Sequence, residues 1–202
     1  MKRENLILLL FICCAAGWAS CNNRTSALER NNYTHIDSLT DTYLNLQDSL
    51  LIAWNVMAKD ENEKLRSIHE VLQAMSSSDL FNKNLVASLE QRLEQVKRIR
   101  FNQKTIANPH VVEEYDFASN SLISEIVSLA ESNLTFIQKK ELQSLIDAIK
   151  EADQRVNYFR SDYDFIAQKF NLFLDNYQNH LKEIDQNAIN GKRPLFQMAS
   201  DN

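Results

Sequence analysis

An uninterrupted helical repeat constrains the fold of this chain more than any other feature. Apolar side chains recur at alternating spacings of three and four, at Leu142, Leu145, Ile149, Ala152, Val156, Phe159, Tyr163, Ile166, Phe170, Phe173 and Tyr177. This spacing places them on one face of an α-helix and is typical of coiled coils. At 1.5 Å per residue, such a helix is roughly 50 Å long. Thr135 and Gln138, at capping-box spacing, are expected to start it.

A second seam of the same kind predicts a long helix over residues 36–75. Its members are Ile36, Leu39, Tyr43, Leu46, Leu50, Ala53 and Met57, followed after a polar stretch by Leu65, Ile68, Leu72 and Met75. The polar stretch leaves open whether this helix is straight or bent near residue 60. Two shorter helices are expected over 81–106 and 112–129, because Ser76–Asp79 and Asn108–Pro109 supply stop and N-cap signals.

The scarcity of glycine argues against β-structure. The chain has two glycines and two prolines, and tight hairpin turns depend on glycine. We therefore expect an all-α fold. Four helices joined by short loops alternate in direction, which predicts an antiparallel four-helix bundle with long, coiled-coil-like helices over residues 35–184. Residues 185–202 are expected to form a loose tail.

The first 21 residues indicate export. Lys2 and Arg3 precede an apolar run that ends in small residues directly before Cys21. This is the pattern of a signal peptide over residues 1–20, and its end resembles the lipobox of bacterial lipoproteins, in which the cysteine is acylated with fatty acids such as palmitate. Trp18 departs from that pattern, so an uncleaved single-span N-terminal anchor and simple secretion remain alternatives. Residues 21–34 read as a polar tether, and a periplasm-facing position in the cell envelope is expected because no acidic cluster follows Cys21.

Known catalytic and metal-binding patterns are missing from the sequence. All three cysteines lie in residues 13–21, and no histidine has a glutamate three residues before it, as di-iron bundles require. Two glycines cannot build a phosphate-binding loop or a dinucleotide-binding motif. The net charge of −5, with only short basic runs, is unlike a nucleic-acid-binding protein. We predict no enzyme activity, no catalytic or metal-binding residues, no cofactor and no small-molecule substrate.

The last helix resembles the C-terminal helix of LemA family proteins. The matching positions are Leu142-Gln143, Asp153, Arg155-Val156, Arg160, Tyr163, Phe170-Asn171 and Leu174. Ala53-Trp54 resembles that family's first helix, and the segment 193–196 (Arg-Pro-Leu-Phe) resembles its ending. Asp153, Asp164 and Phe170 replace the family's Glu, Asn and Tyr, and a Phe-Pro after the last helix repeat is missing. The resemblance implies a helical domain held on a membrane, facing away from the cytoplasm, with no activity assignable to a residue.

Tyr158, Phe165 and Leu172 repeat every seven residues beside the main seam. If Val156 and Tyr163 take heptad position a, this stripe takes position c, which points roughly 130° away from the seam. Either the bundle buries this helix on two sides, or the stripe docks a partner helix. The expected function is therefore a membrane-anchored scaffold or protein-interaction module with a protein partner of unknown identity. A periplasmic helical-bundle ligand sensor is the alternative.

Overall fold

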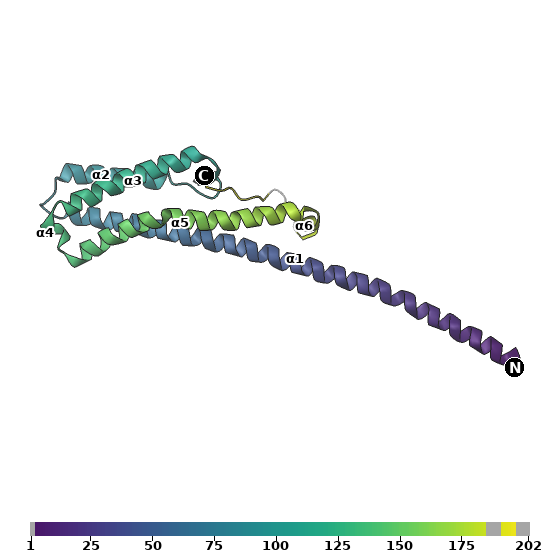
Figure 1. Cartoon of the computed structure of the whole chain (residues 1–202). Helices are drawn as coiled ribbons and strands as arrows, with labels where there is room; N and C mark the ends of the chain where they lie inside the picture. The colour runs from purple at the N-terminus through teal and green to yellow at the C-terminus, as the bar shows by residue number, and fades with distance from the viewer. Residues whose placement is uncertain (1–2, 185–190, 197–202) are drawn as a thin grey trace, which may run out of the picture. The chain divides into compact units, whose positions relative to one another are not determined.

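The computed structural model describes the backbone of residues 3–184 and 191–196, and the side chains of residues 35–182 and 191–196. Within these residues the chain is helical and contains no strand, so the prediction of an all-α fold is confirmed. Four helices are long: α1 (Arg3–Ser76), α2 (Lys83–Arg98), α3 (Pro109–Glu131) and α5 (Lys140–Asn176). The elements η1 (Thr105–Ala107), α4 (Leu134–Ile137) and α6 (Gln178–Ile184) are short (Figure 1).

The chain divides into two compact units, Met1–Asn45 and Leu46–Asn202. The first unit is helical from Arg3, so the residues predicted as signal peptide and tether have helical backbone where the structure describes them. Within its described side chains, the Thr40 and Thr42 hydroxyls donate hydrogen bonds to the carbonyl oxygens of Ile36 and Ser38. No described helix contains a stretch long and apolar enough to cross a membrane.

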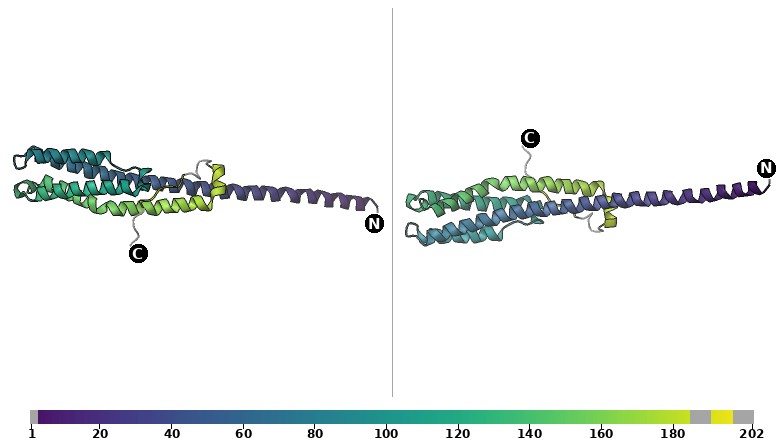
Figure 2. Two further views of the ribbon diagram at one scale, coloured as in Figure 1. Left: turned by 90° about the horizontal axis from the view of Figure 1, so that it is seen from above. Right: turned by 90° about the horizontal axis from the view of Figure 1, so that it is seen from below.

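The second unit holds the core. In it, the Leu46–Ser76 part of α1 lies alongside α2, α3 and α5 in both views of Figure 2. The seam residues predicted for these helices are largely buried, as the periodicity requires. The fully buried side chains include Ile68, Leu72, Met75, Leu89, Leu93, Leu122, Ile126, Phe136, Ile149, Tyr163 and Phe170.

Helix α2 ends earlier than its apolar pattern predicts. It stops at Arg98, although Ile106 is buried and was expected to continue the helix. The side chain of Asn102 accepts hydrogen bonds from the backbone N–H groups of Lys104 and Thr105 and thereby forms a turn that competes with helix. Ile106 therefore reaches the core from η1, and the prediction of a helix through residue 106 is wrong.

The helix starts match the expectations in one case of three. Asn108 caps α3 by accepting from the His110 N–H, with Pro109 as the first helical residue, as predicted. Asn82, rather than the 76–79 segment, caps α2. Asn133 caps α4, and α5 begins only at Lys140, so the predicted capping box at Thr135 and Gln138 does not start the long helix.

Candidate functional site

The stripe of Tyr158, Phe165 and Leu172 lies exposed on α5, with exposed fractions of 69%, 57% and 60%. The alternative that the bundle buries this helix on two sides is therefore wrong. The buried face of α5 carries Ile149, Ala152, Tyr163, Ala167 and Phe170, and a seven-residue repeat at position c points away from that face. The Lys169 ammonium lies 3.9 Å from the centre of the Phe165 ring.

Charges of alternating sign border this stripe. Arg155, Asp162 and Lys169 are exposed, stand seven residues apart, and fall on the helix face next to the stripe. Uncharged polar side chains border the other side, namely Gln154, Ser161 and Gln168. An apolar column between polar borders is the arrangement found at helix–helix seams, where border charges select the partner.

A second group of exposed apolar side chains on α1 was not predicted. Leu51, Ile52 and Val56 are 54%, 63% and 46% exposed. The sequence does carry a signal for them, since residues 50–54 form a run of five apolar residues that cannot all face one core. The predicted seam accounts for Leu50 and Ala53, which are buried, and leaves the others outside it.

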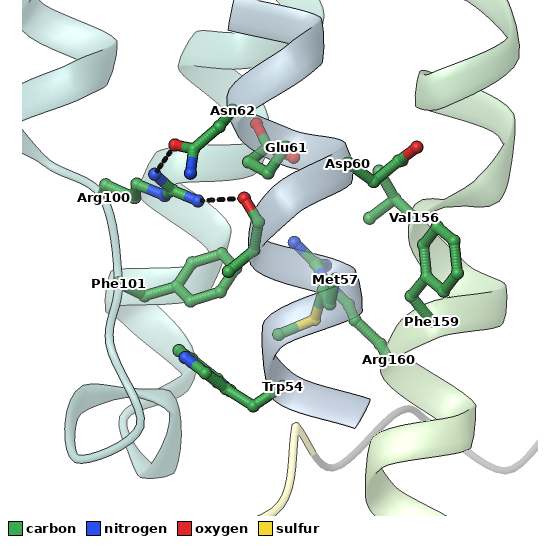
Figure 3. Close-up of a pocket in the computed structure, with 11 residues that line it drawn as sticks. Trp54, Met57, Asp60, Glu61, Asn62, Arg100, Phe101, Val156, Phe159 and Arg160 are labelled. Atoms are coloured by element: carbon green, nitrogen blue, oxygen red, sulfur yellow. Dashed lines mark hydrogen bonds between the residues drawn. The ribbon is translucent and has the colours of Figure 1, made fainter. Parts of the chain in front are cut away.

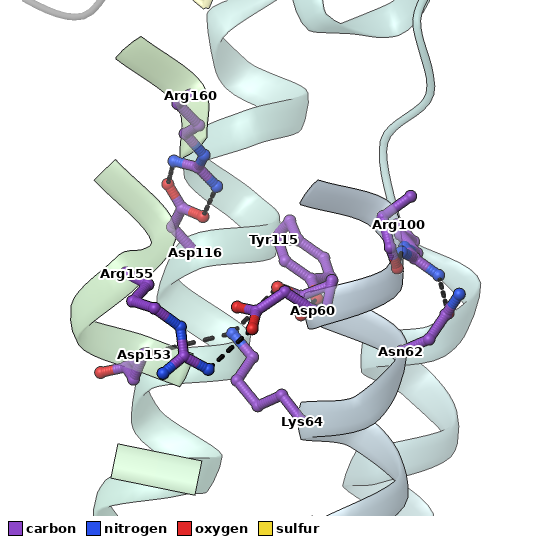
Figure 4. A network of polar contacts seen from close by, with 11 residues as sticks. Asp60, Asn62, Lys64, Arg100, Tyr115, Asp116, Asp153, Arg155 and Arg160 are labelled. Carbon is purple, nitrogen blue, oxygen red and sulfur yellow. Dashed lines mark hydrogen bonds and ion pairs between the residues drawn. The ribbon is translucent and has the colours of Figure 1, made fainter. Parts of the chain in front are cut away.

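A buried ion pair joins α3 and α5. The Arg160 guanidinium donates to both carboxylate oxygens of Asp116, at 2.7 and 2.6 Å (Figure 4). The rings of Phe101 and Phe196 also lie 5.3 and 5.1 Å from the guanidinium carbon of Arg160, at cation–π distance. The Nε atom of Arg160 has no hydrogen-bond partner among the described residues.

A second polar cluster lies where α1 meets α3 and α5. The ammonium of Lys64, whose side chain is 2% exposed, lies 3.0 Å from Glu61 and 4.0 Å from Asp153. Glu61 also accepts a hydrogen bond from the Tyr115 hydroxyl. Burial, reinforced by the Glu61 carboxylate, raises the pKa of Tyr115, so this phenol stays protonated and keeps donating.

A cleft of about 270 Å³ opens beside these clusters, between α1, α5 and the turn after α2 (Figure 3). The side chains of Trp54, Met57, Phe101, Val156 and Phe159 give it an apolar lining. Arg100 stands at its edge, where the guanidinium donates to the side-chain oxygen of Asn62 and the carbonyl oxygen of Ala58. Asp60, also at the cleft, forms an ion pair of 2.7 Å with Arg155.

Residues 191–196 are held against α5. The side chain of Asn171 donates to the Arg193 carbonyl at 2.8 Å and accepts from the Arg193 N–H at 2.7 Å. The Phe196 N–H donates to Asp164 at 2.9 Å, and Lys192 pairs with Asp175 at 2.7 Å. Phe196 is 7% exposed. The expectation of a loose tail therefore does not hold for these six residues, because α5 supplies a polar partner at each of these points.

Cys21, the predicted lipid-attachment residue, has a side chain outside the described residues. Within the described part, no group of His, Cys, Asp and Glu side chains is arranged to hold a metal ion.

No protein-family model matches the chain, and comparison with curated proteins and with solved structures found no similar protein.

Proposed function

We propose that this chain is a LemA-type lipoprotein that acts as a scaffold at the bacterial cell envelope. In this proposal Cys21 carries the lipid, the bundle is held on the periplasmic side of a membrane, and the stripe of Tyr158, Phe165 and Leu172 binds a protein partner. The exposure of this stripe is the observation that carries the proposal. Three large apolar side chains in one column are costly to leave in water, and such surfaces mark interaction sites.

The proposal includes an antiparallel four-helix bundle built from α1, α2, α3 and α5. Contacts between α1 and α5 support it: Lys64 lies near Asp153, Asp60 pairs with Arg155, and Trp54 contacts the ring of Tyr163 at 5.6 Å. From one contact to the next, the α1 partner comes earlier in the chain while the α5 partner comes later, as expected for two helices that run in opposite directions. The short connections between the helices fit the same topology.

The resemblance to the LemA family gains support from what its polar positions do. Asp153, Arg155, Arg160 and Asn171 each contact another element, at Lys64, Asp60, Asp116 and Arg193 respectively. The two matching segments outside the last helix, Ala53-Trp54 and residues 193–196, also come together in the structure. Trp54 and Phe196 both contact the ring of Tyr163. Residues that position elements in this way are those that a shared fold would retain.

The partner is proposed to be an amphipathic helix. The stripe repeats every seven residues, so a partner helix with an apolar residue in each heptad can follow it along α5. Arg155 is already paired with Asp60, so the flanking Asp162 and Lys169 favour a partner whose border charges are basic opposite Asp162 and acidic opposite Lys169.

A photo-reactive amino acid at position 165 should give one discrete adduct with another protein in cells, because the stripe is covered when the partner is bound. The measurement is crosslinking of the full chain, followed by identification of the adduct. Phe117 on α3 is the matched control, since it is the same residue type and is 79% exposed. Intramolecular products alone, or the same adducts from positions 165 and 117, would overturn the proposal.

Cys21→Ser should abolish fatty-acid labelling and release the protein from the membrane fraction. A thioether-linked lipid requires the sulfur of that residue, and in this proposal the acyl anchor supplies the membrane affinity. Metabolic labelling with a palmitate analogue tests this, with Cys13→Ser and Cys14→Ser as controls that keep the label. Labelling that survives Cys21→Ser would contradict the lipid anchor. Loss of the label with retention in the membrane fraction would favour the single-span alternative.

A periplasmic ligand sensor is the second candidate function. The cleft beside Trp54 and Arg100 is the observation that favours it, because ligand sites in bundles lie between helices and combine an apolar lining with few polar groups. A ligand that binds the folded state raises the melting temperature with concentration, whereas the scaffold alone predicts no such shift.

A further inference from the structure

We infer that the cleft between α1, α5 and the Arg100–Phe101 turn is a binding site for a small organic carboxylate with an apolar body. The inference rests on the second candidate function and gives that site its ligand class. It is independent of the stripe on α5. The volume of about 270 Å³ lies near the lower end of ordinary ligand pockets and therefore limits the ligand to a small molecule.

The charges around the cleft favour an anion. Its two acidic side chains are already compensated, Asp60 by Arg155 and Glu61 by Lys64. Arg160 is compensated by Asp116. Arg100 differs, because it donates to two neutral oxygens and forms no ion pair with any acidic residue in the described part of the chain. The cleft therefore presents one guanidinium that a ligand carboxylate could pair with, and guanidinium matches carboxylate geometry well.

The remaining lining favours an apolar ligand body. Trp54, Phe101, Val156 and Phe159 are each only half-buried where they line the cleft. Trp54 and Phe101 meet edge to face, with ring centres 6.5 Å apart, so they offer two differently oriented ring surfaces (Figure 3). A phenyl, indolyl or branched aliphatic group would cover these surfaces while its carboxylate reached Arg100.

The buried Arg160 supplies an independent indication. Its side chain lines the cleft, is 6% exposed and carries an Nε–H without a partner among the described residues. An unsatisfied buried donor is costly, and a ligand oxygen or a water held with the ligand would remove that cost. Apart from Arg100, this donor is the one we expect a bound ligand to satisfy.

The test is titration of the full chain, in detergent, with phenylacetate, indole-3-acetate and isovalerate, monitored by tryptophan fluorescence. The chain has two tryptophans, so Trp18→Phe leaves Trp54 as the reporter inside the cleft. We expect saturable binding of at least one carboxylate and no binding of its neutral amide. Arg100→Gln should weaken that binding roughly 10- to 100-fold, as expected for loss of a charge-assisted hydrogen bond.

Lys97→Gln is the matched control, because this exposed cation lies three residues away, pairs with Glu94 and does not line the cleft. Three results would each overturn the inference: no binding of any of the three carboxylates at millimolar concentration, equal binding of the amide, or equal binding by the Arg100→Gln protein. Circular dichroism of the variants shows whether each is folded. Crosslinking from position 165 reports on the stripe separately, so failure of one proposal does not imply failure of the other.

Discussion

Asp116→Asn should lower the free energy of unfolding by about 3 kcal/mol, because it leaves the Arg160 guanidinium buried without a counter-charge. The Arg160 side chain is 6% exposed and contacts the rings of Phe101 and Phe196. Those rings stabilise a cation only modestly compared with a carboxylate. Asp116 is 34% exposed, so we place the loss at the lower end of the range for broken buried pairs. Urea denaturation followed by circular dichroism measures it.

Asp162→Asn is the control for that substitution, since it makes the same chemical change at an exposed position of α5 and should cost under about 0.5 kcal/mol. Replacing both partners, as Asp116→Leu with Arg160→Met, should recover most of the loss, because no charge is then left buried. Equal losses for Asp116→Asn and Asp162→Asn would show that the pair does not stabilise the fold. A double variant less stable than the single one would argue that the aromatic rings need the guanidinium.

Phe196→Ala should lower the free energy of unfolding by about 3 kcal/mol, the low end for removal of a buried phenylalanine. The ring is 7% exposed and contacts Phe101, Tyr163 and the Arg160 guanidinium. Its removal takes an apolar surface from both α5 and the turn after α2, and it opens the ion pair to water. Thermal and urea unfolding measure the loss, and Phe117→Ala, at a position that is 79% exposed, should cost under about 0.5 kcal/mol.

A loss below about 0.5 kcal/mol for Phe196→Ala as well would mean that residues 191–196 do not hold to the domain in solution. Asn171→Ala separates the two ways in which this segment is attached. It removes both hydrogen bonds to Arg193 and leaves the aromatic contacts in place, so its effect should be smaller than that of Phe196→Ala.

The sequence predicts the helical class and much of the core, because alternating three- and four-residue spacing depends only on helix geometry. Ile149, Tyr163 and Phe170 are buried as that spacing requires. Helix ends are harder to predict, because several side chains near each end can cap. Asn102 and Asn133 form their turns before the expected signals are reached, which shortens α2 and delays the start of α5.

The polar cluster and the cleft could not be predicted from spacing. Lys64, Arg160 and Asp164 are buried, yet each is of a type that usually marks a solvated helix face. Arg160 and Asp164 have partners that are distant in sequence, Asp116 and the Phe196 N–H, and Lys64 lies near the distant Asp153 as well as near Glu61. The stripe is the opposite case: the sequence places Tyr158, Phe165 and Leu172 on one line, but only the packing of the other helices shows that nothing in the described domain covers them.

The Arg160–Asp116 pair also bears on how α3 and α5 find their register. Apolar seams with a seven-residue repeat look alike after a shift of one heptad, so they discriminate poorly between neighbouring alignments. A slide of seven residues would place Pro109 or Ile123 where Asp116 now stands and would leave Arg160 buried opposite an apolar side chain. In the mismatched alignment, this one uncompensated buried charge would lower the free energy of unfolding by several kcal/mol. The buried ion pair thus distinguishes between alignments of α3 and α5 that the apolar seam alone separates poorly.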